Sequence, residues 1–427
     1  MVEELANYES SYFIMNVSTE ADLDIRNMCE KDFAIFFHEY VHFLQDITSF
    51  YGYSGIYWHG EYIRRVVNDI YMSDNPVQIP VFLEDKGDFV LLNKRIAEIS
   101  LGDKSDLNNI FFIKDVFVDS FPLFDTYNIQ ELHVIANADG ETEEIIVGAY
   151  AIRENMAYLL ERNCTTKYRS SAEFPYQIVE LIAQKICPNN KLSDLHIIAL
   201  CDIALQSSTP GPSIFMMLDA ISKGKMAINK PEDIYDFFFS KEVNFLGQKM
   251  KTSEALCNAA GQAIDHLLSY LNIDLPISQE YQKWVSFTMS AGVKLRIQKP
   301  YFFLDMARGK RDKENAILKF LAKNIGSPQM VNAKGKRFQL ATNRPICSFE
   351  YLEVVREIEK LFESGFVKCS LKSWCQMSPD GAPIDERCDK APWRRCNDVL
   401  LCPYGVLWKH WHLGGKEIVI KKRQTNR

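Results

Sequence analysis

The spacing of apolar residues along the chain predicts many helices and a few short strands. Apolar positions recur at helical spacing over residues 31–49, 149–162, 176–186, 195–205, 253–271, 279–291 and 349–363. An apolar run at residues 12–17 predicts a strand, and Asp139-Gly140 between two apolar segments predicts a hairpin. Pro210-Gly211-Pro212 must separate two of the helices. The pattern therefore predicts an α+β protein that is predominantly helical.

The composition and the expected secondary structure change twice along the sequence, which predicts three domains. Residues 1–165 mix strand-like runs with two strong helical patterns, residues 166–366 are mostly helical, and residues 367–427 are rich in Cys and Trp. A chain of 427 residues is too long for one compact core. Its composition, 47% hydrophobic and 25% charged residues, is that of a folded globular protein and argues against disorder.

Charge and the N-terminal sequence narrow the classes of partner. The net charge of −7 argues against a protein that mainly coats nucleic acid or anionic lipid. The first residues are acidic where a signal peptide would be basic, and the chain lacks a run of about 18 apolar residues. We therefore expect a soluble, cytoplasmic protein with no membrane partner and no nucleic-acid partner.

The segment from His38 to His42 contains the pattern H-E-x-x-H inside a predicted helix. Positions four apart lie one above the other on a helix, so the two imidazoles can converge on one metal ion. Glu39 would then lie beside the metal without binding it, where it could take a proton from a water molecule. That is the general-base role of this glutamate in zinc peptidases.

The surroundings of the motif favour a metal. Apolar residues flank it on nearly all sides, so the helix should be buried. A buried polar group without a partner is costly, and a metal ion would satisfy these side chains. The alternative is a pair of buried imidazoles hydrogen-bonded to carboxylates.

A zinc site needs a third protein ligand, and the extended H-E-x-x-H-x-x-G-x-x-H pattern is absent because residues 45 and 48 are Gln45 and Thr48. The best candidate is Glu154, a carboxylate in the middle of the mostly apolar helix 149–162. Such a place is unfavourable for a free charge, and coordination would explain it.

Other residues could complete the site or support it. The rivals for the third position are His59, Glu61, His133 and Asp46. Asp46, and equally Gln45, could instead accept a hydrogen bond from an imidazole and fix its tautomer. Tyr150 and Tyr158 lie one helical turn from Glu154, where each could stabilise an oxyanion or simply pack in the core.

These residues resemble the gluzincins, the thermolysin-like clan of zinc metallopeptidases, and a group of poorly characterised bacterial proteins with H-E-Y-x-H-x-L-Q on the active-site helix. The resemblance covers about residues 30–60 and 145–163. It implies a zincin-like catalytic domain with a small sheet, with His38, His42 and Glu154 as zinc ligands and Glu39 as the catalytic base. One departure is the interval between His42 and Glu154, which is much longer than in thermolysin-like enzymes.

The cysteines fall into two groups. Six lie in apolar sequence, where we expect reduced core thiols: Cys29, Cys164, Cys187, Cys201, Cys257 and Cys347. The other five crowd into residues 367–427: Cys369, Cys375, Cys388, Cys396 and Cys402.

That C-terminal tail carries a net charge of +6, against −13 for the rest of the chain. Its five thiols could bind a second, structural metal, pack as reduced thiols among the tryptophans, or form disulfides. The absence of a C-x-x-C pair weakens the case for metal. The tail could also bind a protein partner.

The sequence therefore favours a zinc-dependent metallopeptidase that hydrolyses a polypeptide substrate. The alternative is a non-catalytic binding protein on a zincin scaffold, acting through the helical domain and the basic tail, for example Arg394 and Arg395. A third hypothesis is a regulatory protease with a single target, held inactive until triggered.

Overall fold

The computed structural model divides the protein into two compact units. It describes residues 5–81, 88–123, 127–166, 171–269, 276–340, 350–377 and 382–421. Unit 1 comprises Met1–Ile56, Arg95–Ile264 and Ser286–Arg344, and unit 2 comprises Tyr57–Lys94, Asp265–Val285 and Pro345–Arg427. The boundary predicted at residue 165 falls inside unit 1, and the boundary predicted at residue 366 falls inside unit 2. Both units are assembled from segments far apart in the sequence. A change of composition along the chain cannot show which distant segments pack together.

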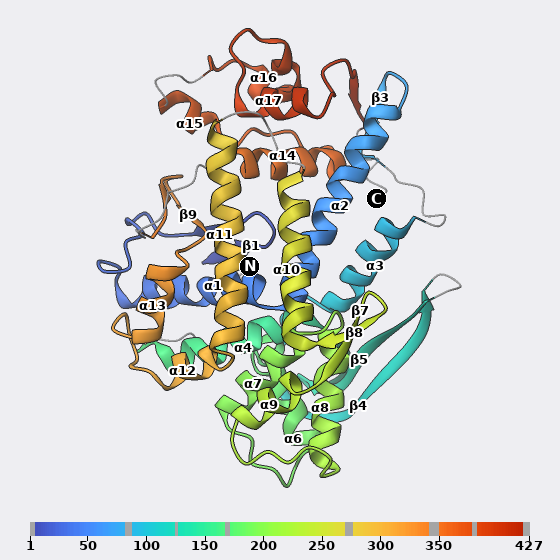
Figure 1. The fold of residues 1–427 in the computed structure, drawn as a ribbon, viewed down its shortest axis with the longest axis vertical. Helices are drawn as coiled ribbons and strands as arrows, with labels where there is room; N and C mark the ends of the chain where they lie inside the picture. The colour runs from blue at the N-terminus through green and yellow to red at the C-terminus, as the bar shows by residue number, and fades with distance from the viewer. Residues whose placement is uncertain are drawn as a thin grey trace. The chain divides into compact units, whose positions relative to one another are not determined.

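The chain is α+β and predominantly helical, as predicted (Figure 1). The strands of unit 1 are β1 (Ala6–Glu9), β2 (Ile14–Val17), β4 (Ile110–Leu123), β5 (Tyr127–Ala138), β6 (Glu141–Val147), β7 (Glu242–Phe245), β8 (Gln248–Lys251), β9 (Gln329–Asn332) and β10 (Arg337–Phe338). Its helices are α1 (Glu30–Thr48), α4 (Ala149–Cys164), α5 (Glu173–Tyr176), α6 (Ile178–Ile186), α7 (Asp194–Ala204), α8 (Pro210–Ser222), α9 (Glu232–Phe239), α12 (Phe302–Arg308) and α13 (Ala316–Asn324).

The division between the units falls within four helices, and the rest of unit 2 is built from short elements. The four helices are α2 (Phe50–Met72), α3 (Phe89–Leu101), α10 (Thr252–Ser269) and α11 (Pro276–Gln298). The remaining elements of unit 2 are β3 (Val77–Ile79), α14 (Glu350–Ser364), α15 (Lys372–Met377), α16 (Arg387–Lys390), the 3-10 helix η1 (Pro392–Asn397), α17 (Pro403–His410) and β11 (Ile418–Ile420). None of the helices in the described ranges has the length and apolar character needed to cross a membrane.

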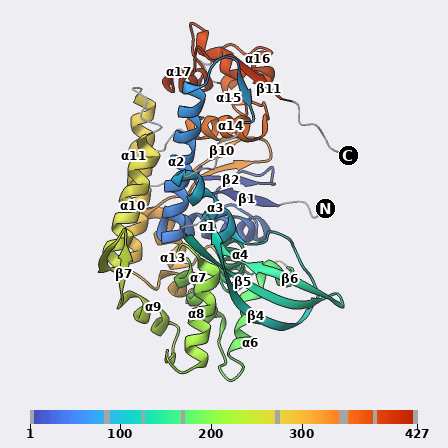
Figure 2. The same ribbon diagram turned by 90° about the vertical axis from the view of Figure 1, so that its right-hand side faces the viewer.

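The two larger sheets of unit 1 differ in topology. β1, β2, β9 and β10 form a sheet in that order, with β2 and β9 parallel and both outer pairs antiparallel. β4, β5 and β6 form an antiparallel meander, which Figure 2 shows beside α6 and α8. Asp139 and Gly140 have the positive φ angles that the predicted tight turn between β5 and β6 requires.

Helix α1 is the core of unit 1. It is buried from Phe33 to Thr48, as the apolar residues on all its sides predict. Its start is fixed by Cys29, whose sulfur accepts a hydrogen bond from the backbone N–H of Asp32. Helix α4 packs against α1, and α7 and α12 pack against α4. Since α1 is polar only at a few positions, each buried polar group on it needs a partner.

Most of the predicted elements are confirmed, and the main omissions have a common cause. Helices α1, α4, α6, α7, α10, α11 and α14 and strands β2, β5 and β6 lie within a few residues of their predicted positions. Helix α2 and strand β4 were not predicted. Helix α2 contains three glycines and many aromatic residues, and β4 has mostly exposed side chains, so neither shows a regular apolar pattern.

The expectation of core thiols was wrong for two of the scattered cysteines. Cys29 and Cys257 are exposed, whereas Cys164, Cys187 and Cys201 are buried. Both exceptions lie on helices or helix caps at solvent-facing positions, which their apolar neighbours in sequence do not reveal. Cys347 lies outside the described residues.

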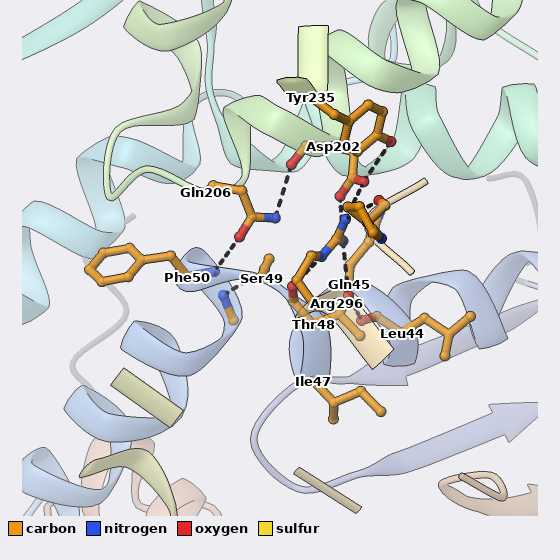
Figure 3. A network of polar contacts seen from close by, with 12 residues as sticks. Leu44, Gln45, Ile47, Thr48, Ser49, Phe50, Asp202, Gln206, Tyr235 and Arg296 are labelled. Carbon is orange, nitrogen blue, oxygen red and sulfur yellow. Dashed lines mark hydrogen bonds and ion pairs between the residues drawn. The ribbon is translucent and has the colours of Figure 1, made fainter. Parts of the chain in front are cut away.

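The C-terminal end of α1 is held by a buried ion pair (Figure 3). Arg296 donates to both carboxylate oxygens of Asp202 at 2.7 Å, and its Nε donates to the carbonyl oxygen of Thr48 at 3.0 Å. Tyr235 donates a further hydrogen bond to Asp202. The side chains of Arg296 and Asp202 are at most 1% exposed. A cation at the last turn of a helix also satisfies carbonyl groups that lack a partner within the helix.

We predict that Asp202→Asn lowers the free energy of unfolding by about 3–5 kcal/mol, because it leaves the guanidinium of Arg296 buried and uncompensated. Urea unfolding followed by circular dichroism measures the change. Lys223→Ala, which breaks the exposed pair with Asp219, is the matched control and should cost less than about 1 kcal/mol. The double variant Asp202→Leu/Arg296→Met should recover part of the loss, because no buried charge is left uncompensated while Thr48 and Tyr235 still lose their partners. Equal stability of Asp202→Asn and the control would contradict the interpretation.

Candidate metal centre

Helices α1 and α4 bring three predicted ligands together. His38 and His42 lie one turn apart on α1, and their rings are 5.0 Å apart between centroids. Glu154 lies on the second turn of α4 and faces both rings. Gly148 precedes α4, and a Cβ atom there would lie 2.4 Å from the carbonyl carbon of Leu101, so only glycine fits where this helix begins.

Each oxygen of Glu154 faces one imidazole. His38 Nε2 lies 3.1 Å from Oε2, and His42 Nε2 lies 3.3 Å from Oε1. Among the described residues, this is the only group of three or more His, Cys, Asp or Glu side chains with ligand atoms all within 4.8 Å of one another. The three side chains could therefore hold a metal ion, as the sequence predicted.

The opposite nitrogen of each imidazole is also engaged. His38 Nδ1 donates to Glu161 Oε2 at 3.0 Å, and His42 Nδ1 donates to Gln45 Oε1 at 2.9 Å. The amide of Gln45 is oriented by its own NH2 group, which donates to the carbonyl oxygen of Arg153. Its oxygen must therefore point to His42, which assigns the proton of His42 to Nδ1.

Because of these hydrogen bonds, a positive charge is needed between the two imidazoles and Glu154. With both protons on Nδ1, the Nε2 lone pairs of His38 and His42 face the carboxylate of Glu154, and lone pairs are repelled by an anion. Without a metal, a proton must relieve this repulsion. Burial lowers the pKa of His38, but the hydrogen bonds to Glu154 and Glu161 outweigh burial and raise it to about 10. Burial raises the pKa of Glu154, but the two imidazoles hold it well below its usual value.

A divalent cation would relieve the same repulsion at both imidazoles at once. Two nitrogen ligands and one carboxylate, each imidazole held from behind by an acceptor, form the ligand set and the outer support expected of a metal centre. The residues present therefore fit a metal ion.

The centre opens into a large cavity. Its volume is about 1030 Å³, and its lining includes His38, His42 and Glu154 together with Glu39. Glu39 is 6% exposed, so its carboxylate lies between buried protein and the cavity. Residues of β1 also line the cavity, as do several tyrosines, among them Tyr150, Tyr158 and Tyr176. The centre is thus accessible to a ligand from one side.

The rival third ligands lie elsewhere or have other partners. Asp46 pairs with Arg153 at 3.2 Å, so Gln45 and not Asp46 supports His42. His133 lies on β5 and contacts Glu144 on β6 at 2.8 Å. In unit 2, His59 Nδ1 lies 3.5 Å from Glu359, and Glu61 binds Arg64 and His266.

The tail cysteines do not all lie together. Cys369, Cys375, Cys388 and Cys402 line one small cavity in unit 2, whereas Cys396 does not line it. All five have free thiols in the structure, which disagrees with the disulfide alternative. Arg395, suggested as a docking residue, is only 2% exposed and bonds to Asp398, so it cannot present its charge to a partner.

Sequence reasoning missed Glu161 and Tyr176. Glu161 is 1% exposed and lies seven residues after Glu154, two turns along the same face of α4. That spacing of two carboxylates in an apolar helix was the available signal. Tyr176 ends the short helix α5 and meets the edge of the His38 ring at 6.2 Å between centroids. Its sequence neighbourhood gave no indication of this contact.

No protein-family model matches this chain, and neither does any curated protein or solved structure with which it was compared. The resemblance to the gluzincins therefore stays a prediction, and a function for the chain has to be inferred from the geometry of the centre.

We predict that Glu161→Ala weakens metal binding about 10–100-fold, because the imidazole of His38 loses the acceptor that orients it. Glu161→Gln keeps an oxygen acceptor at that place and should retain most of the affinity. Competition with a metallochromic chelator measures the dissociation constant of each variant. Glu144→Ala, which removes the acceptor of a histidine outside the centre, is the control and should bind metal as the wild type does. Wild-type affinity in Glu161→Ala would contradict the assigned role.

Proposed function

We propose that the protein is a zinc-dependent metallopeptidase with a zincin-like catalytic domain. One observation carries the proposal: the Nε2 atoms of His38 and His42 face the two oxygens of Glu154, on the wall of a cavity that Glu39 also lines. Three protein ligands leave one coordination position of a tetrahedral ion for water or substrate, which is typical of catalytic and not of structural zinc.

Two imidazoles and a carboxylate favour zinc among the common metals, since magnesium and calcium prefer oxygen ligands throughout. A bound zinc ion would supply a Lewis acid for the scissile carbonyl and make a water molecule acidic enough to react near neutral pH. The protein must supply everything else: a base, an oxyanion donor and a site for the chain to be cleaved.

Glu39 is the proposed general base. It follows the first histidine on α1, and its side chain borders the cavity without belonging to the ligand group. In this role it takes a proton from the attacking water and then delivers it to the amine that leaves. A carboxylate that is mostly buried but open to the cavity can reach substrate while its surroundings exclude bulk solvent.

The cavity suits an extended polypeptide. Its volume of about 1030 Å³ is at the upper limit of sites for small molecules, which are roughly 300–1,000 Å³. β1 is an outer strand of its sheet and lines the cavity through Ala6, Asn7 and Tyr8. An outer strand offers backbone groups to a peptide that adds to the sheet, a common way of binding peptides in extended form.

A tyrosine hydroxyl is the proposed oxyanion donor. Tyr150, Tyr158 and Tyr176 all line the cavity, and the rings of Tyr158 and Tyr176 lie 6.0 Å apart. Tyr176 is also the residue whose ring meets His38. A hydroxyl at this place could donate to the negative oxygen that develops on the scissile carbonyl.

We predict that Glu39→Gln keeps stoichiometric zinc but slows peptide hydrolysis about 10²–10⁴-fold, because the amide cannot accept the proton. A library of synthetic peptides, analysed by mass spectrometry for new termini, measures cleavage, and elemental analysis measures zinc. His42→Ala should lose both zinc and cleavage.

A further variant controls for damage to the cavity. Lys104→Ala changes a residue that lines the cavity without belonging to the ligand group, and it should retain zinc and most of the cleavage. The proposal is wrong if zinc-loaded Glu39→Gln cleaves the same peptides as fast as the wild type. Full biological activity of Glu39→Gln, with wild-type zinc content, would favour the non-catalytic binding protein.

A further inference from the structure

The buried cysteines have two kinds of surroundings. The sulfur atoms of Cys164, Cys187 and Cys396 contact carbonyl oxygens, those of Met306 at 3.3 Å, Leu218 at 3.2 Å and Gly414 at 4.0 Å. A carbonyl oxygen only accepts hydrogen bonds, so each of these cysteines is a neutral thiol that donates its S–H. The S–H group of each of these residues therefore has an acceptor in the core.

Three of the cysteines around the small cavity in unit 2 have hydrogen-bond donors as partners. The sulfur of Cys402 accepts from the backbone N–H of Gly405 at 3.5 Å, and that of Cys388 accepts from the guanidinium of Arg395 at 3.1 Å. Cys369 has a hydrogen bond from the backbone of Leu371. A thiol sulfur is a weak acceptor, whereas a thiolate is a good one, so donors directed at sulfur favour the deprotonated form.

The four cysteines Cys369, Cys375, Cys388 and Cys402 line this cavity together, although they come from four places in the tail. Cys375 lies on α15 and Cys388 on α16, Cys402 caps α17, and Cys369 precedes α15. Helix α17 packs against α14 within unit 2, and Figure 1 shows both helices in the C-terminal part of the chain. The cavity has a volume of about 10 Å³, which is the space of one water molecule or one ion. Its position among four sulfur atoms suits a single small cation.

Four thiolates around so small a cavity need a cation between them. Like charges at short range repel one another, and burial makes each charge costly. Sulfur atoms that line one ion-sized cavity, with N–H groups directed at them, are arranged for a metal that would displace the thiol protons.

We propose that Cys369, Cys375, Cys388 and Cys402 bind a structural Zn²⁺ ion as four thiolates. Four soft thiolates in a closed site are a usual ligand set for structural zinc. The ion would leave a charge of −2 on the site, and the buried Arg395 beside Cys388 offsets part of it. No three of the sulfur atoms lie within 4.8 Å of one another, so binding draws the four side chains inward.

The site would stabilise the short elements of unit 2. α15 has six residues and α16 has four, too few for either helix to be stable alone. A zinc ion that joins residues on α15 and α16 to residues just before α15 and α17 supplies the folding energy that a small hydrophobic core lacks. This role is separate from the proposed peptidase centre, which lies in unit 1.

Zinc content per chain tests the proposal. After dialysis against a weak chelator, elemental analysis of the full-length wild type should give two zinc ions, and His42→Ala should give one. The double variant Cys375→Ser/Cys402→Ser should also give one. Ser at position 402 can still cap α17, so the variant removes ligands and keeps the cap. Cys396→Ser, which changes a buried tail cysteine outside the cavity, is the matched control and should keep two.

Cobalt substitution decides the matter even if the cysteine variants fold poorly. Co²⁺ bound by thiolates gives an intense sulfur-to-metal charge-transfer absorption, and Co²⁺ bound by imidazole and carboxylate does not. The wild type and His42→Ala should both show this absorption. Its absence from folded, cobalt-loaded wild type would overturn the proposal, as would loss of zinc from Cys396→Ser equal to that from the double variant. Neither result bears on the peptidase centre, whose zinc is followed by the loss in His42→Ala.

Discussion

The arrangement around Glu154 is the constraint on which the candidate site depends. Two imidazoles, each with its proton committed to an acceptor behind it, present their remaining lone pairs to one carboxylate. Such a cluster is stable only if a positive charge occupies its centre. The buried acceptors Glu161 and Gln45 are therefore as informative as the ligands, because they determine which nitrogen of each ring is available to a metal.

The helices that carry these groups are held by contacts away from the metal centre. The backbone close to Gly148 fixes where α4 begins, and Arg296 holds the last turn of α1. A second close approach is at Gly292 on α11, where a Cβ atom would lie 2.0 Å from the carbonyl oxygen of Ile47. Small shifts of α1 are thereby resisted on several sides, which keeps the imidazoles at the distances that a metal ion requires.

The ligands of the metal centre could be predicted from the sequence because their helical spacing and the apolar residues around them both point to a buried site. His38, His42 and Glu154 could be selected because each is a polar residue in an apolar helix, and such residues need a partner. Spacing alone could not show that Gln45 rather than Asp46 supports His42, since both lie on the turn after it and the choice depends on Arg153 of another helix. The two units escaped prediction because their segments alternate along the chain. The grouping of four tail cysteines without Cys396 likewise depends on tertiary packing.

The anchoring of α1 by Arg296 has a consequence for dissecting the protein. The guanidinium of Arg296 bonds to Thr48 and to Asp202, so the end of the histidine-bearing helix is completed by residues about 150 and 250 positions further along the chain. A fragment limited to residues 1–165 would include every ligand of the His38-His42-Glu154 centre and lack both members of that ion pair. Such a fragment would leave the carbonyl oxygen of Thr48, at the end of α1, without its partner. A fragment meant to fold on its own and keep the metal centre must therefore extend through α11.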